Sequence, residues 1–142
     1  MVIICVPVVP CFSLSIESVR ICNDSVERVQ FLVEFADTFE GRQKGLSNRD
    51  SIGENEGMLF DFLEEKRPKI WMKDTRFSLD LIFAREDGII VYVEPRVPPF
   101  SHKIFQPEMN VRFLLEVNGG IASFHNILKG DRLVIGNDSC FK

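Results

Sequence analysis

The stretch from Gly57 to Ala84 constrains the fold of this chain more than any other. It contains three short apolar runs, and a fourth follows it. Charged or turn-forming residues separate the four runs: G-M-L-F-D-F, I-W-M-K, L-D-L-I-F-A and I-I-V-Y-V-E. Runs of this length, bounded in this way, are typical of consecutive β-strands rather than of helices. Asp87-Gly88 lies between the last two runs, and an Asp-Gly pair in that position predicts a tight β-hairpin.

The rest of the chain follows the same pattern, so we predict an all-β fold: a small antiparallel β-barrel or sandwich-like domain with two short helices. One helix is expected from the capping sequence at Asp37-Thr38 to about Lys44, with Gly45 as its stop, and another near residues 121–128. Residues 95–110 contain four Pro and are expected to form a long loop that no strand crosses. Antiparallel strands are predicted near residues 29–36, 58–62, 69–73, 79–84, 89–94, 112–117 and 132–135.

The chain divides into a leader, a linker, a domain and a tail. Residues 1–16 carry no charged side chain and are interpreted as a signal peptide or another apolar leader, too short to span a membrane comfortably. That choice stays open, because no Lys or Arg precedes the apolar run and two Pro interrupt it. Residues 17–28 are predicted to be a linker, residues 29–136 a single β-rich domain, and residues 137–142 a polar tail.

Charge and cysteine spacing exclude several classes of site and partner. The net charge of −4 and the lack of a Lys/Arg cluster argue against a nucleic-acid partner. No C-x-x-C spacing occurs and the chain has only two His, so neither a metal site nor a cofactor is expected. An exported, periplasmic or envelope-associated protein is expected, rather than an integral membrane protein, with a cytoplasmic protein as the alternative.

Two cysteines remain near the ends of the domain if the leader is removed near Ser15. In an oxidising compartment Cys22 and Cys140 would be free to form a disulfide. Nothing in the sequence shows that the two ends of the domain meet, so the pairing stays open. The oligomeric state is not predicted.

Several strands place a charged side chain on the face opposite their apolar face, because side chains alternate along a strand. If the sheet curls, these side chains converge in one shallow concavity. The ligand-binding candidates are Arg49, Trp71, Lys73, Asp80, Glu94 and Glu116. The alternative is a solvated sheet face with weak cross-strand ion pairs.

Asp80 is the acid that we single out among these candidates. Leu79 and Leu81 flank it, so it is expected to be desolvated and to need a partner. If strands 69–73 and 79–84 form a hairpin, Lys73 comes to lie opposite Asp80 on the same face. Arg49 is the second possible partner.

Six short motifs occur in order between residues 30 and 135: V-E-F-A-D-T, G-L-S-N-R, G-M-L-F, I-W-M-K-D-T with L-D, L-L-E-V-N-G-G and K-G-D. In this order and spacing they resemble the uncharacterised bacterial and archaeal family called domain of unknown function 192 (DUF 192). The resemblance implies a small, mostly β, barrel-like domain, often behind an export signal, with no established activity. The chain departs from the family pattern at Ser47, where Met is frequent, and at Asp74, where Asn is frequent.

Our first interpretation is a non-enzymatic domain of the cell envelope that binds a small polar or carbohydrate-like ligand. Aromatic side chains together with carboxylates suit hydroxyl-rich ligands. A hydrolase-type enzyme with paired carboxylates is one alternative. A protein-interaction module that uses a strand edge or the Pro-rich segment is another. No nucleophile elbow, phosphate loop or H-E-x-x-H motif is present, so no catalytic residue is assigned.

Overall fold

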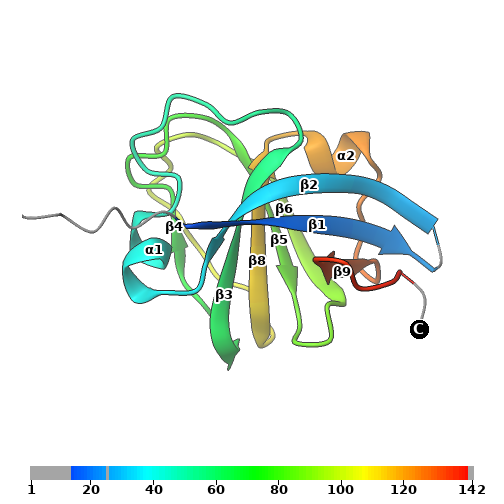
Figure 1. Cartoon of the computed structure of the whole chain (residues 1–142). Coiled ribbons are helices and arrows are strands. Elements are labelled where there is room, and N and C mark those ends of the chain that lie inside the picture. Colours follow the sequence, from blue (N-terminus) through cyan, green and yellow to red (C-terminus); the bar gives the residue numbers. More distant parts are fainter. Residues whose placement is uncertain (1–13, 25, 141–142) are drawn as a thin grey trace, which may run out of the picture.

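The structure is a computed structural model, which describes residues 14–24 and 26–140. These residues form nine strands and two short helices, so the predicted all-β class and the two helices are confirmed (Figure 1). In chain order the elements are β1 (Ser15–Asn23), β2 (Val26–Ala36), α1 (Phe39–Lys44), β3 (Glu56–Lys66), β4 (Ile70–Trp71), β5 (Leu79–Ala84), β6 (Ile90–Val97), β7 (Ile104–Phe105), β8 (Val111–Asn118), α2 (Ile121–Phe124) and β9 (Arg132–Ile135). No helix among the described residues is long and apolar enough to cross a membrane.

Seven strands make one curled sheet in the order β6-β5-β8-β3-β2-β1-β9 (Figure 1). Its two ends meet at an isolated bridge between Ile89 and Arg132. Three backbone hydrogen bonds of 2.8 Å lie beside it, from Leu133 to Gly88, from Ile90 to Asp131 and from Gly130 to Ile90. The edge strands form no continuous ladder with each other. A sandwich-like fold is therefore the better description, and a closed barrel is not confirmed.

The sheet has an apolar core on each of its faces. One core gathers side chains from both ends of the sheet, including Ile90 and Leu133, so it fills the concave side, where α2 also packs. The second core lies on the opposite face and includes Met58, Leu81 and Leu114. The sequence prediction of one apolar and one mixed face missed this second core.

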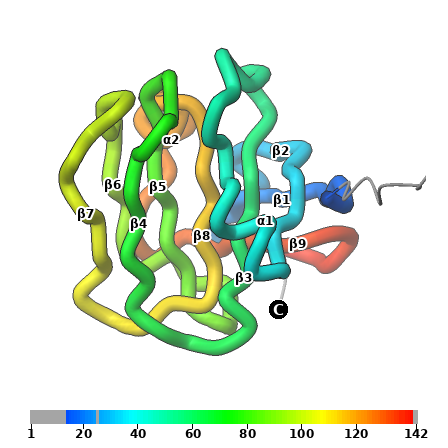
Figure 2. Tube along the Cα trace, turned by 90° about the vertical axis from the view of Figure 1, so that its left-hand side faces the viewer, coloured from blue at the N-terminus to red at the C-terminus, as the bar shows by residue number. Residues whose placement is uncertain are grey.

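A separate ribbon of β4 and β7 contributes to the second core. Figure 2 shows β4 and β7 side by side in front of β5 and β6. Ile70 and Phe105 are paired in the ribbon and pack with that core. The predicted hairpin between residues 69–73 and 79–84 is wrong, because β4 pairs with β7 while β5 pairs with β6 and β8.

The hairpin predicted at Asp87-Gly88 is confirmed, since β5 and β6 pair antiparallel around it. Gly88 has φ +84°, and its N–H donates to the Arg85 carbonyl at 2.9 Å. A Cβ at this position would lie 2.4 Å from the Leu133 carbonyl oxygen. Glycine is therefore needed both for the turn and for the close approach of β9.

The prediction of antiparallel strands throughout is wrong at one place, because β2 and β3 pair in parallel. A parallel pair requires a crossover connection, which leaves the sheet at one end of the strands and enters it again at the other end. Here that connection covers residues 37–55 and contains α1. The Thr38 hydroxyl caps α1 by accepting from the Gly41 N–H at 3.1 Å, and Gly45 ends the helix as predicted.

Two further expectations about loops and linkers are wrong. Residues 17–28 are not a linker, because β1 and the start of β2 occupy them and the buried Val19 and Ile21 supply an inward face. Residues 95–110 do not form an unbroken loop, because β6 runs through Pro95 to Val97 and β7 follows. Proline is tolerated in β6 because this strand lies at the edge of the sheet.

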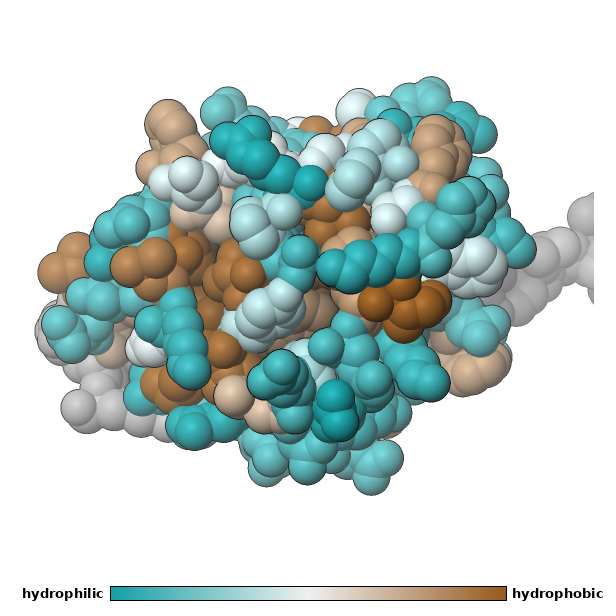
Figure 3. All heavy atoms as spheres, turned by 180° about the vertical axis from the view of Figure 1, so that it is seen from behind, coloured by the Kyte–Doolittle hydropathy of each residue, from teal (hydrophilic) through white to brown (hydrophobic). Residues whose placement is uncertain are grey.

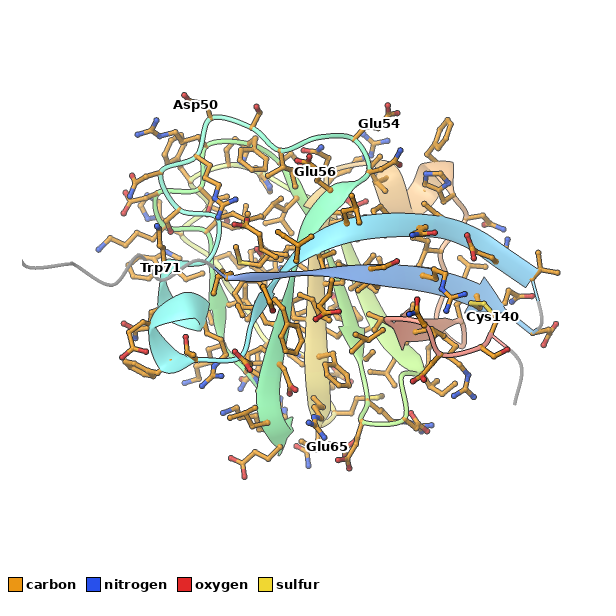
Figure 4. All side chains as sticks on the ribbon, viewed as in Figure 1. Asp50, Glu54, Glu56, Glu65, Trp71 and Cys140 are labelled. Atoms are coloured by element: carbon orange, nitrogen blue, oxygen red, sulfur yellow. A yellow bond between two sulfur atoms is a disulfide. The ribbon has the colours of Figure 1, made fainter. Side chains whose placement is uncertain are left out.

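The two ends of the domain meet at a disulfide between Cys22 and Cys140, whose Cα atoms are 5.8 Å apart (Figure 4). The start of the predicted polar tail is therefore anchored on β1, and residues 141–142 lie outside the described residues. The predicted leader also lies largely outside them, since the description starts at Leu14 and β1 starts at Ser15.

Candidate functional site

A pocket of about 650 Å³ opens between α1, β3 and β4. Figure 2 shows α1 and β4 on the same side of the molecule, with β3 between them. One part of the pocket wall is α1, which belongs to the connection between the parallel strands β2 and β3. Another part is β4. The volume falls in the range of roughly 300–1,000 Å³ that small-molecule sites occupy.

Glu116 of β8 lies at the base of this pocket. Its cross-strand neighbours are Met58 and Leu81, both fully buried and apolar. The Glu116 side chain is only 6% exposed, and no hydrogen bond or ion pair engages its carboxyl group anywhere in residues 14–24 and 26–140. Burial alone raises the pKa of Glu116 from 4.5 to about 8, because desolvation penalises the charged form. At neutral pH the carboxyl is therefore largely protonated and able to donate a hydrogen bond.

Two aromatic side chains stand at the rim. Trp71 is 51% exposed and Phe39 is 64% exposed, although both line the pocket. Figure 4 shows Trp71 on β4, close to α1 and far from the loops that carry Asp50 and Glu54. Large aromatic surfaces left open to water beside a pocket are suited to stacking on a ligand.

Basic side chains complete the lining. The Lys73 Nζ lies 5.4 Å from the centroid of the Trp71 ring, and the Lys66 Nζ lies 5.7 Å from that of Phe62, both within cation–π range. No ion pair in the described part of the chain engages any of these basic groups. The pocket's cationic residues are Arg42, Lys44, Lys66, Lys69 and Lys73.

Three of the six residues predicted from the sequence line this pocket: Trp71, Lys73 and Glu116. Glu94 lies on the same sheet face, since Leu81 pairs with both Glu94 and Glu116, but it is one strand further away at the edge of the sheet. The Glu94 carboxylate accepts from the Tyr92 hydroxyl instead.

Arg49 forms an ion pair with Glu34 and lines a smaller neighbouring cavity of about 220 Å³. Arg49 was the second possible partner of Asp80, and this ion pair with Glu34 shows that it is not. Glu34 pairs in register with Met58 and so lies on the same sheet face as Glu116.

Asp80 lies on the opposite face, because it pairs with Val117 while its neighbour Leu81 pairs with Glu116. Its carboxylate is fully buried and accepts backbone N–H groups at 2.7–3.1 Å. The donors are Arg96, Gly120 and Ala122. Asp80 thus anchors the start of α2 and the end of β6 from inside the concave core. The pairing of Asp80 with Lys73 depended on a hairpin between their strands; it does not form, because β4 pairs with β7 and Asp80 faces the concave core.

The sequence interpretation missed the basic residues of α1, of the end of β3 and of the segment after it. Lys66, Arg67 and Lys69 stand in the run K-R-P-K, and Lys66 is the last residue of β3. That run was the available signal, since Lys66 and Lys69 both line the pocket. Arg42 and Lys44 carried no such signal, because only the parallel crossover brings α1 to this side.

Comparison with known proteins adds the family. The family model DUF192, described as an uncharacterized ACR, matches residues 20–135. The chain belongs to the DUF192 family. The match starts within β1, so it includes most of the segment that was predicted to be a linker. A search of curated proteins found no match.

Two crystal structures are similar to this DUF192 protein. One is a protein of Sinorhizobium meliloti 1021, provisionally named a transcription regulator, with 33% identity and a TM-score of 0.83 over 87% of this chain and 95% of that chain. The other is a protein of unknown function from Novosphingobium aromaticivorans DSM 12444, with 29% identity and a TM-score of 0.82 over 88% of this chain and 89% of that chain.

Proposed function

We propose that this DUF192 protein is a non-enzymatic domain that binds a small polar ligand in the pocket between α1, β3 and β4. The observation that carries the proposal is Glu116, a buried carboxyl group that faces the pocket without a partner in the described structure. Because Glu116 lines the pocket, its carboxyl group can find a hydrogen-bond partner there. A ligand that accepts a hydrogen bond from Glu116 is held in a fixed orientation.

The rim supports a ligand with a flat or apolar face. Trp71 and Phe39 are exposed at the pocket mouth, whereas Phe60 and Phe62 line it deeper inside. Aromatic rings beside a hydrogen-bonding group at the base fit a molecule that is apolar on one side and polar on another. Carbohydrate-like ligands are one class with this character.

A hydrolase with paired carboxylates receives less support from the same pocket. Glu116 is buried at its base, while the second acid of the lining, Asp74, is exposed. The paired-carboxylate mechanism needs two carboxyl groups on either side of the scissile bond. Among the described residues, no cluster of three metal-ligating side chains offers another catalytic centre.

Macromolecular partners also receive less support. Phe124 and Leu128 are exposed in and after α2. On the face of the molecule opposite to that of Figure 1, Figure 3 shows hydrophilic side chains interspersed with apolar ones. The net charge of −4 does not favour a nucleic-acid partner.

We propose an exported location for the protein, because the Cys22–Cys140 disulfide is of a kind that persists in oxidising compartments. Fractionation of cells that produce the full chain should recover it outside the cytoplasm. Intact mass should show loss of the apolar leader. Cytoplasmic protein that retains Met1 would contradict this location.

The binding proposal is tested by the fluorescence of Trp71, because this is the only Trp of the chain and it stands at the pocket rim. Neutral sugars, polyols and small organic acids are titrated, and thermal unfolding is followed in parallel. We expect at least one compound to change the emission saturably and to raise the unfolding midpoint.

The matched variants are Glu116→Leu, which removes the polar group at the base, and Glu54→Gln, which changes an exposed acid far from Trp71 (Figure 4). Binding should disappear in the first variant and persist in the second. A panel in which no compound changes either the emission or the midpoint overturns the binding function.

A further inference from the structure

We infer that the ligand of this pocket is a small aromatic or apolar organic anion, whose acidic group is held between the basic rim and Glu116. The inference rests on the proposed binding function and narrows its ligand class. It follows from three separate properties of the pocket: the charge of its lining, the state of its base and the apolar surface between them.

The lining has a charge opposite to that of the whole chain. The chain carries a net charge of −4, yet the pocket is lined by five cationic side chains and by two acids, Asp74 and Glu116. A concave surface of one sign focuses the electrostatic potential and attracts ligands of the other sign. A cationic ligand would therefore be repelled from this pocket.

These cations lack the carboxylate partners that arginines have elsewhere in the molecule. Arg76 is paired with Asp50, Arg85 with Asp87, and Arg112 with Asp61. In the pocket, Arg42 donates only to backbone carbonyls, and the four lysines form no ion pair within the described residues. A single exposed lysine without a partner is ordinary. Five such groups around one pocket leave its positive charge uncompensated.

Glu116 is compatible with an anion because it is protonated. Met58 and Leu81 flank it in the sheet, and the charged groups that line the pocket around it are the five cations and Asp74. Its pKa of about 8, raised by burial, leaves the carboxyl neutral at pH 7. A neutral carboxyl donates one O–H, and hydrogen bonds to an ionised acceptor are about twice as strong as those between neutral groups.

The apolar requirement comes from the aromatic side chains. Lys73 is held over Trp71 at the rim and Lys66 over Phe62 deeper inside, so a cation lies beside an aromatic ring at two places in the pocket. An inorganic anion would use only the cations. An aromatic acid uses both, because its ring stacks while its acidic group reaches the ammonium groups and Glu116.

Four probes of matched size test the inference: benzoate, phenyl phosphate, benzyl alcohol and benzylamine. Binding is measured by isothermal calorimetry and by Trp71 fluorescence. We expect at least one anion to bind about tenfold or more tightly than benzyl alcohol. A tenfold difference in affinity corresponds to about one charge-assisted hydrogen bond. Benzylamine should bind weakest. The order of benzoate and phenyl phosphate distinguishes a carboxylate ligand from a phosphate ligand.

Two charge-reversal variants test the role of the rim. In Lys69→Glu with Lys73→Glu, anion affinity should fall by about tenfold or more, while benzyl alcohol affinity should change little. Lys103→Glu with Lys129→Glu is the matched control, because it makes the same change in net charge at lysines that do not line the pocket. Lys103 even resembles Lys73, since its Nζ lies 4.8 Å from the Phe105 ring centroid. The control should keep its anion affinity.

The role of Glu116 as a donor is tested through pH. Anion affinity should fall as pH rises through about 8, because deprotonation places a negative charge at the base of the pocket. Glu116→Gln keeps an N–H donor that does not titrate, so it should bind the anion with little pH dependence over the same range. If Glu116 has only a structural role, the anion affinities of the wild type and of Glu116→Gln should change with pH in parallel.

The outcomes separate the anion inference from the binding function. If benzyl alcohol or benzylamine binds as tightly as the anions, the anion inference is wrong while the pocket is still a binding site. If none of the four probes binds, the inference is equally wrong, and the sugar and polyol panel alone then decides the binding function. Loss of anion affinity in the Lys103 and Lys129 control would also contradict it.

Discussion

Asp80 and Glu116 are buried acids on adjacent strands, and their surroundings differ in a decisive way. Asp80 accepts three backbone N–H groups, from Arg96, Gly120 and Ala122. Glu116 has only apolar strand neighbours, and its carboxyl group faces a pocket. The first arrangement uses the carboxylate to hold backbone segments together, whereas burial in the second raises the pKa of Glu116 and leaves its carboxyl group available.

Asp80→Asn should destabilise the protein. The amide replaces one acceptor oxygen by an NH₂ group that faces backbone donors, so at least one hydrogen bond is lost in a fully buried place. The free energy of unfolding should fall by roughly 1–3 kcal/mol, measured by urea denaturation. Lys73→Met is the control and should have little effect, because Lys73 does not contact Asp80. An unchanged midpoint for Asp80→Asn would contradict the anchoring role.

Glu116 should make stability decrease with rising pH. Between the ordinary pKa of 4.5 and the folded-state pKa of about 8, the folded protein keeps a proton that the unfolded chain has released. Rising pH therefore favours unfolding across this window, by roughly 3–5 kcal/mol in total for this one group.

Glu116→Gln removes that dependence, since an amide does not titrate. Urea denaturation of both proteins between pH 5 and pH 9 should show the variant gaining on the wild type as pH rises from 5 to about 8, with the difference levelling off above that pH. The other titrating groups are shared, so their effects cancel in the difference. A difference that stays constant with pH would show that Glu116 titrates normally.

At the scale of the elements, side-chain periodicity predicted where the strands lie but not which strands are neighbours. The runs around residues 58–62 and 79–84 become β3 and β5 as predicted. Which face Asp80 occupies depends on its pairing with Val117 in β8, and that register is set by contacts between distant segments. The sequence placed Asp80 and Glu116 on one face, and a difference of one position in register separates them.

Parallel pairing was equally hidden from the sequence. Nothing local in β2 or β3 distinguishes a parallel partner from an antiparallel one. The connection over residues 37–55 forms part of the pocket wall. Only the pocket residues in or next to the predicted strands could therefore be predicted from the sequence. Trp71, Lys73 and Glu116 belong to that group, while Arg42 and Lys44 do not.

Thr38→Ala should weaken α1 and, through it, the pocket. The helix is too short to form without its cap and its tertiary contacts. Loss of the hydrogen bond from the Gly41 N–H to the Thr38 hydroxyl should lower stability by about 1 kcal/mol, measured by denaturation, and reduce ligand affinity as the pocket wall frays. Thr38→Ser keeps the hydroxyl and should restore both. Equal behaviour of the two variants would show that the cap does not matter.

At the scale of the whole molecule, the sequence predicted one β-rich domain but placed its start too late. The polar residues of β1 alternate with Val19 and Ile21, and without its neighbouring strands this short alternation resembles a mixed linker. The strand becomes evident only with its partners, because β1 pairs with β2 on one side and with β9 on the other. Local sequence patterns also do not show whether the ends of the chain meet, so the sequence alone does not predict the disulfide.

Reduction of the Cys22–Cys140 disulfide should destabilise the protein. The bond joins residues 118 positions apart, and the chain-entropy model assigns such a closure roughly 4–5 kcal/mol. Urea denaturation of exported protein with and without a reducing agent should show this loss, and Cys22→Ser with Cys140→Ser should reproduce it without the reagent. Identical midpoints in all three cases would show that the bond adds no stability.

The same bond changes how the molecule would respond to a pulling force. Tension applied between Ser15 and Cys140 would run along β1 to Cys22 and then cross the S–S bond. Only the part of β1 before Cys22 would have to separate from β2 and β9. The residues between Asn23 and Ser139 form a covalently closed loop and would bear no tension. With the disulfide intact, the pocket would be shielded from mechanical load; once the disulfide was reduced, the whole sheet would lie in the path of the force.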